Sequence, residues 1–286
     1  MAIPLLARKP NRILPPLLRN DDLLRGLAFA LFCNEPGKGP LWDAVHGYAV
    51  APGSASAKAM SPYGLAARVN GSGNSGWQSS GNQAPLVTST ADGTGDLTLM
   101  MIMNCPASAS GGQSLGGQSD HNEVGGGVGF FANWNASFAN TSGSVGFDCF
   151  TANDDVGIVC ASQLDGGHHV LVGKRAGSTH ALWVDATKPA QTVFGSGVSN
   201  ILGGTNNTLA IYDDAAQSFS VPFMAGWNRA LSDAEIVYVS LLAWEALVDY
   251  GHPALNPLPL PPSAWRLATR RPPKRSFVWS DGRLRR

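Results

Sequence analysis

One pentapeptide of the sequence has the spacing of a catalytic nucleophile. Gly112-Gln113-Ser114-Leu115-Gly116 matches the G-x-S-x-G pattern of serine hydrolases, and Asp120 and His121 follow it closely. In those enzymes the serine lies on a sharp turn between a strand and a helix. Here the serine lies among glycines, and no helical periodicity follows it. We therefore expect no working triad of serine, histidine and aspartate.

Paired carboxylates are the second arrangement that would do chemistry. A glycoside hydrolase needs two acids about 5–10 Å apart on either side of the sugar. Asp154-Asp155 and Asp213-Asp214 are adjacent pairs, so on a strand their side chains would point to opposite faces. Turn formation explains such pairs better. The sequence therefore predicts a protein that is not an enzyme.

Acidic residues in turn-rich segments could ligate a metal ion. Calcium prefers carboxylate and carbonyl oxygens, and the main candidates are Asp120, Glu123, Asp154 and Asp155. Their spacing matches no calcium-binding loop, so calcium is the one cofactor that the sequence leaves open. A zinc site is not expected, because no C-x-x-C pair occurs among Cys33, Cys105, Cys149 and Cys160. These cysteines are expected to be free, mostly buried thiols.

Sugar recognition would use an exposed aromatic ring with amide side chains beside it. Trp134 stands between Asn133 and Asn135, and Trp77 is the next candidate. The alternative is that both tryptophans are half-buried and pack within the fold. The sequence by itself leaves both interpretations open.

A β-hairpin is predicted in the last third of the sequence. Alternating apolar residues over His168–Lys174 and Ala181–Asp185 are joined by a Gly-containing loop, as in hairpins. We expect Trp183 to be buried between two sheets. His168 and His169 are expected to be strand residues rather than ligands.

A helix start is predicted after the hairpin. Ser232 and Glu235 have the spacing of a capping box, and Leu231 and Ile236 are placed to form a hydrophobic staple. A helix is therefore predicted over 233–248.

At these residues the chain resembles the concanavalin A-like (laminin-G-like) lectin/glucanase superfamily. The matching strings are His168-His169-Val170, Leu182-Trp183-Val184-Asp185 and Asn228-Arg229-Ala230-Leu231-Ser232-Asp233-Ala234-Glu235-Ile236. Gly166-Gly167 and Ala186 depart from the usual family residues, and the Glu-x-Asp-x-x-Glu string of the related glycosidases does not occur. The resemblance implies a jelly-roll β-sandwich of two antiparallel sheets.

The composition fits one large all-β domain. Of 286 residues, 34 are glycine and only 14% are charged, which suits short strands separated by turns. Leu97–Met103 is apolar on both faces, as in a central strand covered on both sides. The Gly-rich segment 106–127 predicts a long surface loop. We expect an all-β fold with one short C-terminal helix and an extended arm at each end.

The net charge is zero, but the charges are segregated. Residues 1–25 carry five basic and two acidic side chains, and residues 252–286 carry eight basic and one acidic, which leaves seventeen acidic and seven basic for residues 26–251. We therefore predict a sandwich over 26–251 between a basic N-terminal arm and a basic, Pro-rich C-terminal arm. The residues of the second arm expected to dock on a neighbour are Trp265, Arg270, Arg271, Lys274, Arg275, Phe277 and Trp279.

No export or membrane signal is expected from this sequence. The apolar stretch before Arg8-Lys9 is too short for a signal peptide, and Leu27–Cys33 is far shorter than the roughly 20 residues of a membrane span. A lectin-like sandwich with these features resembles the concanavalin A-like structural proteins of tailed-bacteriophage virions, which are made in the host cytoplasm. That resemblance implies a capsid-decoration, tail or fibre component. Its expected partners are other virion proteins, copies of itself and a host-surface glycan.

Other interpretations stay open. The chain could be a bacterial carbohydrate-binding or adhesion module, which a glycan array would identify. A degenerate glycoside hydrolase is the third candidate, which sugar release from polysaccharides would identify. Nucleic acid is a less favoured partner, reached through the basic arms.

Overall fold

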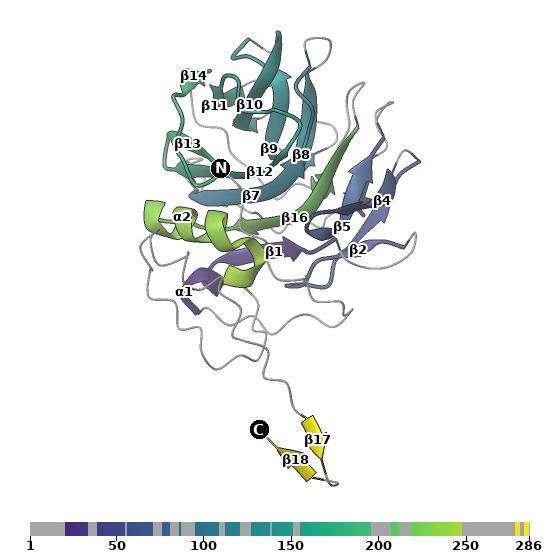
Figure 1. Ribbon diagram of the computed structural model, residues 1–286. Coiled ribbons are helices and arrows are strands. Elements are labelled where there is room, and N and C mark those ends of the chain that lie inside the picture. The colour runs from purple at the N-terminus through teal and green to yellow at the C-terminus, as the bar shows by residue number, and fades with distance from the viewer. Residues whose placement is uncertain are drawn as a thin grey trace. The chain divides into compact units, whose positions relative to one another are not determined.

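The described residues form two antiparallel sheets (Figure 1). The structure is a computed structural model, and it describes residues 21–33, 39–54, 56–70, 76–80, 86, 95–108, 112–120, 127–137, 139–150, 155–195, 207–211, 218–247, 278–280 and 283–285. Among them, seven strands form the first sheet, in the order β13 (Thr179–Val184), β12 (His168–Ala176), β7 (Leu97–Asn104), β16 (Phe219–Trp227), β5 (Gly64–Val69) and β4 (Ser56–Ser61), with β1 (Leu27–Leu31) also paired to β16.

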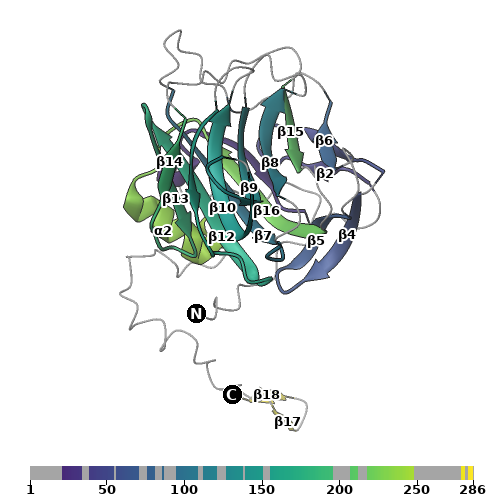
Figure 2. The same ribbon diagram turned by 90° about the horizontal axis from the view of Figure 1, so that it is seen from above.

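Nine described strands form the second sheet, in the order β14 (Thr192–Phe194), β11 (Asp155–Cys160), β10 (Asn140–Phe150), β9 (Gly127–Trp134), β8 (Gln113–Asp120), β15 (Asn207–Ile211), β6 (Trp77–Ser79), β3 (Ala49–Pro52) and β2 (Leu41–Trp42). The two sheets face each other (Figure 2), which confirms the predicted all-β sandwich. A separate unit, residues 251–286, contains the two-stranded hairpin of β17 (Val278–Ser280) and β18 (Arg283–Arg285).

Alternating residues of the central strand β7 belong to two different cores. Leu99 and Met101 pack between the sheets with residues such as Phe130 and Phe147, whereas Met100 and Ile102 pack on the opposite face of the first sheet. Seven of the eight residues of β7 are buried. The prediction of a strand covered on both sides is therefore confirmed, and the methionines serve as packing residues.

Helix α2 (Asp233–Leu242) covers the outer face of the first sheet, with Ile236 and Val239 buried against it. The capping box is present as predicted: the Ser232 hydroxyl accepts from the Glu235 amide, and the Glu235 carboxylate accepts from the Ser232 amide. The α-helix is shorter than the predicted 233–248. It ends at Leu242 because Ala243 has φ +51°, and a 3-10 turn, η1 (Ala243–Ala246), follows. No described helix is long and apolar enough to cross a membrane.

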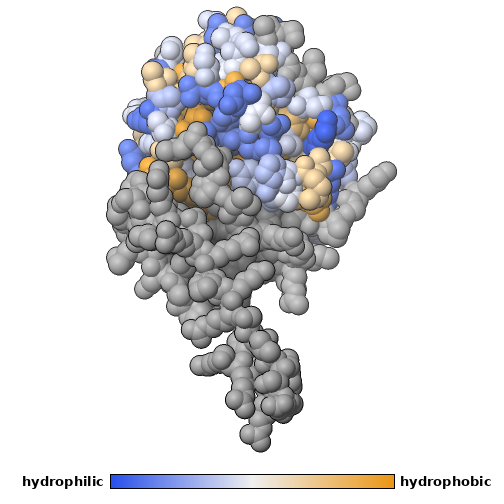
Figure 3. All heavy atoms as spheres, in the orientation of Figure 1, coloured by the Kyte–Doolittle hydropathy of each residue, from blue (hydrophilic) through white to orange (hydrophobic). Residues whose placement is uncertain are grey.

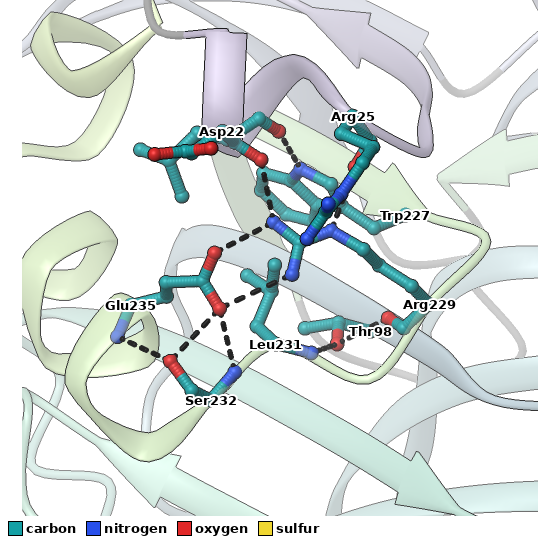
Figure 4. Close-up of polar contacts among 9 residues, drawn as sticks. Asp22, Arg25, Thr98, Trp227, Arg229, Leu231, Ser232 and Glu235 are labelled. Atoms are coloured by element: carbon teal, nitrogen blue, oxygen red, sulfur yellow. Dashed lines mark hydrogen bonds and ion pairs between the residues drawn. The ribbon is translucent and has the colours of Figure 1, made fainter.

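Arg229, just before α2, ties the start of the described chain to the sandwich (Figure 4). Its guanidinium donates to the Glu235 carboxylate at 2.7 and 3.1 Å and to the carbonyls of Asp22 and Arg25 at 2.8 and 2.7 Å. The indole of Trp227 donates to the carbonyl of Leu23 at 2.7 Å. These bonds satisfy the carbonyls of Asp22 and Leu23 in the short helix α1 (Asp21–Leu24) and that of Arg25 just after it. The Asn228–Ile236 motif therefore works as a structural junction.

Trp183 is buried, but not between the two sheets as predicted. Its neighbours Leu182 and Val184 face the inter-sheet core, so strand alternation directs Trp183 to the cluster beneath α2. The ammonium groups of Lys174 and Lys188 lie 5.0 and 5.1 Å from the centre of its ring. The indole is only 3% exposed.

The prediction of a long loop over 106–127 is wrong, because residues 113–120 form strand β8. The strand pairs with β9 from Gln113 opposite Ala132 to Ser119 opposite Gly127, and a register shift lies between Ser114 and Gly116. Gly116 has φ +137°, and an added Cβ would lie 2.6 Å from the carbonyl oxygen of Ala210. Glycine is thus required for this irregular strand to approach its neighbour. The Gly-rich composition, which is typical of loops, therefore led to the wrong prediction for a segment that forms a strand.

Candidate functional site

An irregularity at the end of β9 brings Trp134 to the outer face of the nine-stranded sheet. Phe130 and Ala132 face the inter-sheet core, and Phe131 faces outward. Strict alternation would turn Trp134 inward. Asn133 has φ +59°, however, and Trp134 instead packs beside Phe131, with ring centres 6.3 Å apart. Backbone irregularities of this kind re-aim a side chain and occur next to functional sites.

Asn133 is a positioning residue rather than the ligand-binding residue that the sequence predicted. Its side chain is fully buried. Its Oδ1 accepts from the amides of Gly143 and Ser108 at 2.9 and 3.0 Å, and its Nδ2 donates to the carbonyl of Pro106 at 3.1 Å. These bonds hold a left-handed backbone conformation, which asparagine adopts more readily than most other residues with a side chain. The conformation is therefore fixed next to Trp134.

The indole of Trp134 lies directly over a glycine. A Cβ on Gly112 would fall 1.7 Å from the ring, so only glycine allows this position. The ring is half-buried, with Gly112 and Phe131 against it and the remainder reaching solvent. Trp134 therefore presents part of a flat apolar surface on a rigid support.

Asn140, which the sequence analysis missed, lies opposite Trp134. It is the register partner of Trp134 on β10, and it is exposed. Its Oδ1 accepts from the amide of Gly112 at 2.9 Å, which orients the side-chain amide. Among the described residues, none accepts a hydrogen bond from its Nδ2. Only the register of β9 and β10 identifies this residue, because no local pattern distinguishes it from the other asparagines.

The other two predicted sugar-binding residues have structural roles. The Oδ1 of Asn135 accepts from the amides of Ser137 and Ala139 at 2.8 and 3.1 Å, and so closes the turn after β9. Trp77 is 1% exposed in the inter-sheet core, where its Nε1 donates to the carbonyl of Arg68 at 3.2 Å. Of the two predicted tryptophans, Trp134 alone keeps exposed surface for a ligand.

The predicted calcium ligands are not brought together where the structure describes them. Asp120 is paired with Asn207 on β15, and Asp155 is paired with Phe150 on β10. Three strand spacings, or about 14 Å, separate β8 from β11, the strands on which these two aspartates lie. Glu123 and Asp154 lie outside the described residues. Within the described part of the chain, no group of three or more acidic, His or Cys residues could hold a metal ion.

The predicted docking residues of the C-terminal arm lie mostly outside the described residues. These are Trp265, Arg270, Arg271, Lys274, Arg275 and Phe277. Trp279 is described as part of β17, where it is paired with Leu284 of β18.

The side chains that could act as nucleophiles lie in unsuitable surroundings. Ser114 is paired with Phe131 near the start of β8, and β8 continues to Asp120 rather than turning into a helix. All four cysteines are free and buried. Burial raises the pKa of Cys149 to about 12 and that of Cys160 to about 11, which removes the reactive thiolate.

His169 on β12 contacts two carboxylates with its ring nitrogens. Its Nδ1 lies 2.9 Å from Asp185 Oδ2, and its Nε2 lies 3.0 Å from Asp165 Oδ1. The hydrogen bond with Asp185, followed by the carboxylate charges, raises the pKa of His169 despite its partial burial. Both ring nitrogens are satisfied, as expected for a strand residue. His168 differs, because its buried Nε2 has no hydrogen-bond partner and burial lowers its pKa.

No protein-family profile matches the chain, and no curated protein matches it. Among solved structures, the chain is similar to the receptor-binding domain of botulinum neurotoxin type G (TM-score 0.52, 10% identity) and to that of botulinum neurotoxin D (TM-score 0.53, 10% identity). It is also similar to the ligand-binding domain of botulinum neurotoxin serotype D in complex with N-acetylneuraminic acid (TM-score 0.52, 9% identity).

Each likeness covers 75% of this chain but only 51%, 52% and 50% of the respective structures, so the chain spans about half their length. At these identities the likeness shows the fold, a lectin-like β-sandwich, and nothing further.

Proposed function

We propose that this chain is a non-enzymatic, glycan-binding module in which a sugar ring stacks on Trp134. One observation carries the proposal: the left-handed backbone of Asn133 turns Trp134 out of the core and onto the outer face of the nine-stranded sheet. The buried, hydrogen-bonded side chain of Asn133 thus provides a rigid support for a half-exposed aromatic ring.

The chemistry around the ring fits a sugar. An indole face binds the C–H side of a pyranose, while amide groups hydrogen-bond to its hydroxyls. Asn140 supplies the amide, held in orientation by Gly112. The coloured part of the face seen in Figure 3 is mainly hydrophilic, with small separate hydrophobic areas. Sugar binding by a neurotoxin domain of similar fold is further support.

A glycan array with three proteins tests this proposal. The wild-type protein should bind a subset of glycans, and Trp134→Ala should lose that binding by about tenfold or more while keeping the wild-type melting temperature. Trp42→Ala is the matched control, because Trp42 is 44% exposed on β2, at the opposite end of the same sheet. Binding that survives in Trp134→Ala, or that is lost equally in Trp42→Ala, would refute the assignment.

The absence of catalysis is part of the same proposal. A bound glycan should be released unchanged after prolonged incubation, as measured by reducing-end assay. Ester substrates should be cleaved no faster than in buffer, and Ser114→Ala should change neither result. Turnover that disappears in Ser114→Ala would show the chain to be an enzyme.

The biological setting that we propose is the virion of a tailed bacteriophage, with the arms serving assembly. The support is the charge distribution, with eight basic and one acidic residue in 252–286 against seventeen acidic and seven basic in 26–251. A truncation after Gly251 should leave a folded sandwich that no longer joins its oligomer or particle. Reversing the charge of Arg270, Arg271, Lys274 and Arg275 to Glu should have the same effect at full length. Normal assembly of both variants would exclude this role.

A further inference from the structure

A three-residue clasp joins two turns at one end of the first sheet. Asp165 lies in the bend of residues 161–167 that precedes β12, and Asp185 lies in the tight turn that follows β13. His169 connects their carboxylates with its two ring nitrogens, at 3.0 and 2.9 Å. An imidazole can donate from both nitrogens only when it is protonated, so this geometry is that of an imidazolium.

Backbone bonds fix both ends of the clasp. Asp185 Oδ1 accepts from the amide of Val170, and the amide of Asp185 donates to the carbonyl of Val170, each at 2.9 Å. Asp165 Oδ1 also accepts from the amide of Gly167 at 2.7 Å. Because both aspartates are also bonded to the backbone, a movement of the His169 ring displaces the backbone of residues 161–167 and not only the aspartate side chains.

The same bend supports the Trp134 site. The amides of Gln163 and Leu164 both donate to the carbonyl of Gly143, at 2.7 and 2.8 Å. The amide of Gly143 in turn donates to Asn133 Oδ1 at 2.9 Å. A continuous path of bonds thus leads from His169 through Asp165, the bend and Gly143 to the residue that turns Trp134 outward.

We propose that His169 is a positioning residue whose protonation state controls the orientation of Trp134. This inference rests on the sugar-binding function proposed above for Trp134. With the imidazolium in place, the bend holds Gly143 against Asn133, and Trp134 keeps its outward position. When the imidazolium loses its proton, one ring nitrogen faces a carboxylate without a hydrogen to share. The bend of residues 161–167 then loosens, and Trp134 binds its glycan more weakly.

The pH range of the clasp follows from the groups around His169. The pKa of His169 is raised above its ordinary 6.5, so its contribution is complete below about 6.5 and is lost as pH rises through the raised pKa. Hydrogen bonds from Gly167 and then His169 lower the pKa of Asp165 below its ordinary 3.8, so its contribution is present above about 3.8 and is lost as pH falls through the lowered pKa. The clasp is therefore strongest between about pH 4 and 6.5.

Two neighbouring groups titrate outside the pH range in which His169 loses its proton. Burial, followed by the charge of His169, lowers the pKa of His168 below its ordinary 6.5, so His168 loses its proton before His169 does as pH rises. Tyr63, whose ring packs edge-on against His168, has a pKa raised above 10.0 by burial and by Asp185. Between about pH 6.5 and 10, the clasp therefore responds chiefly to His169.

A nuclear magnetic resonance titration tests the device without any ligand. The indole N–H signal of Trp134, assigned from its loss in Trp134→Phe, should shift in one step with the midpoint of the His169 ring. Hydrogen exchange at the Gly143 and Leu164 amides should accelerate through the same midpoint by more than base catalysis accounts for. The step should vanish in His169→Gln and move to lower pH in Asp165→Asn. Glycan affinity should fall about fivefold across the same step.

His46→Gln is the matched control, because His46 also lies beside an aspartate, 3.4 Å from Asp43, but outside this path. It should retain the step. An indole signal that does not move while His169 titrates, or an unchanged step in His169→Gln, would overturn the inference. If instead the titration behaves as expected but no glycan binds, the clasp stands and the proposed sugar-binding function fails.

Discussion

The ring of Phe131 lies flat over Gly146, its register partner on the neighbouring strand. A Cβ on Gly146 would fall 1.9 Å from the ring. The same relationship recurs at Gly127 with Phe150 and at Gly157 with Phe194, each pair directly opposite in the register. The aromatic ring covers backbone that glycine leaves bare, and so restores packing that a glycine-containing strand otherwise lacks. This arrangement explains how a chain with 34 glycines builds a continuous sheet.

Gly146→Ala should destabilise the protein by about 1–3 kcal/mol, because Phe131 has to leave its position over the strand. Chemical denaturation followed by fluorescence measures the change. Combining Gly146→Ala with Phe131→Leu should cost less than the sum of the two single changes, since the smaller side chain leaves room for the new methyl group.

Gly39→Ala is the control for that experiment. It adds the same methyl group where no atom lies within 4 Å, so the free energy of unfolding should change by no more than about 0.5 kcal/mol. Equal effects of the two substitutions would mean that the ring of Phe131 does not restrict position 146.

Arg229→Ala should destabilise the sandwich by about 2 kcal/mol. It removes a bidentate, partly buried pair with Glu235 and the bonds that hold the carbonyls of Asp22 and Arg25. The comparison is Asp233→Asn in the same helical turn, which breaks the exposed pair with Lys174 and should cost less than about 1 kcal/mol. Hydrogen exchange should locate the loss of protection at residues 21–25.

Lowering the pH should weaken the ion pair between Arg229 and Glu235 and so reduce the stability of the protein. The hydrogen bond from Arg229 lowers the pKa of Glu235 from its ordinary 4.5 to about 2. The stabilisation is therefore complete above about pH 4.5 and is lost as pH falls toward 2. Stability measured between pH 5 and 2 should decline less steeply in Glu235→Gln than in the wild type, and parallel declines would argue against this ionic contribution.

Trp183→Ala should destabilise the protein by roughly 3–5 kcal/mol, since a large buried ring is lost from the cluster beneath α2. The two lysine ammonium groups beside the ring lose their aromatic partner as well. A melting temperature like that of the wild type would place Trp183 outside the packed cluster.

Local sequence patterns were sufficient for several elements. The capping box at Ser232 and Glu235 marked the start of α2, and the two-sided apolar run at Leu97–Met103 marked the central strand. Both signals come from residues within one element, where propensity and periodicity act directly. The helix end was less accurate, because the backbone reversal at Ala243 carries no sequence signal.

The candidate site depended on contacts between distant parts of the chain. Asn133 and Asn135 were chosen because they flank Trp134, but their side chains hold the backbone, while Asn140 is the amide opposite the ring. Trp77 was a candidate from residue type alone, and burial in the inter-sheet core removed it.

By itself, then, the sequence determined the all-β class, the two-sided central strand and the helix start, because each depends on periodicity or capping within a few residues. Tertiary structure alone decided that glycine-rich segment 113–120 is a strand, that Trp134 faces outward and that His169 meets both Asp165 and Asp185. These three features depend on strand register and on side-chain contacts between turns, which join residues far apart in the sequence. A single-residue change of register reverses the face of every side chain in a strand.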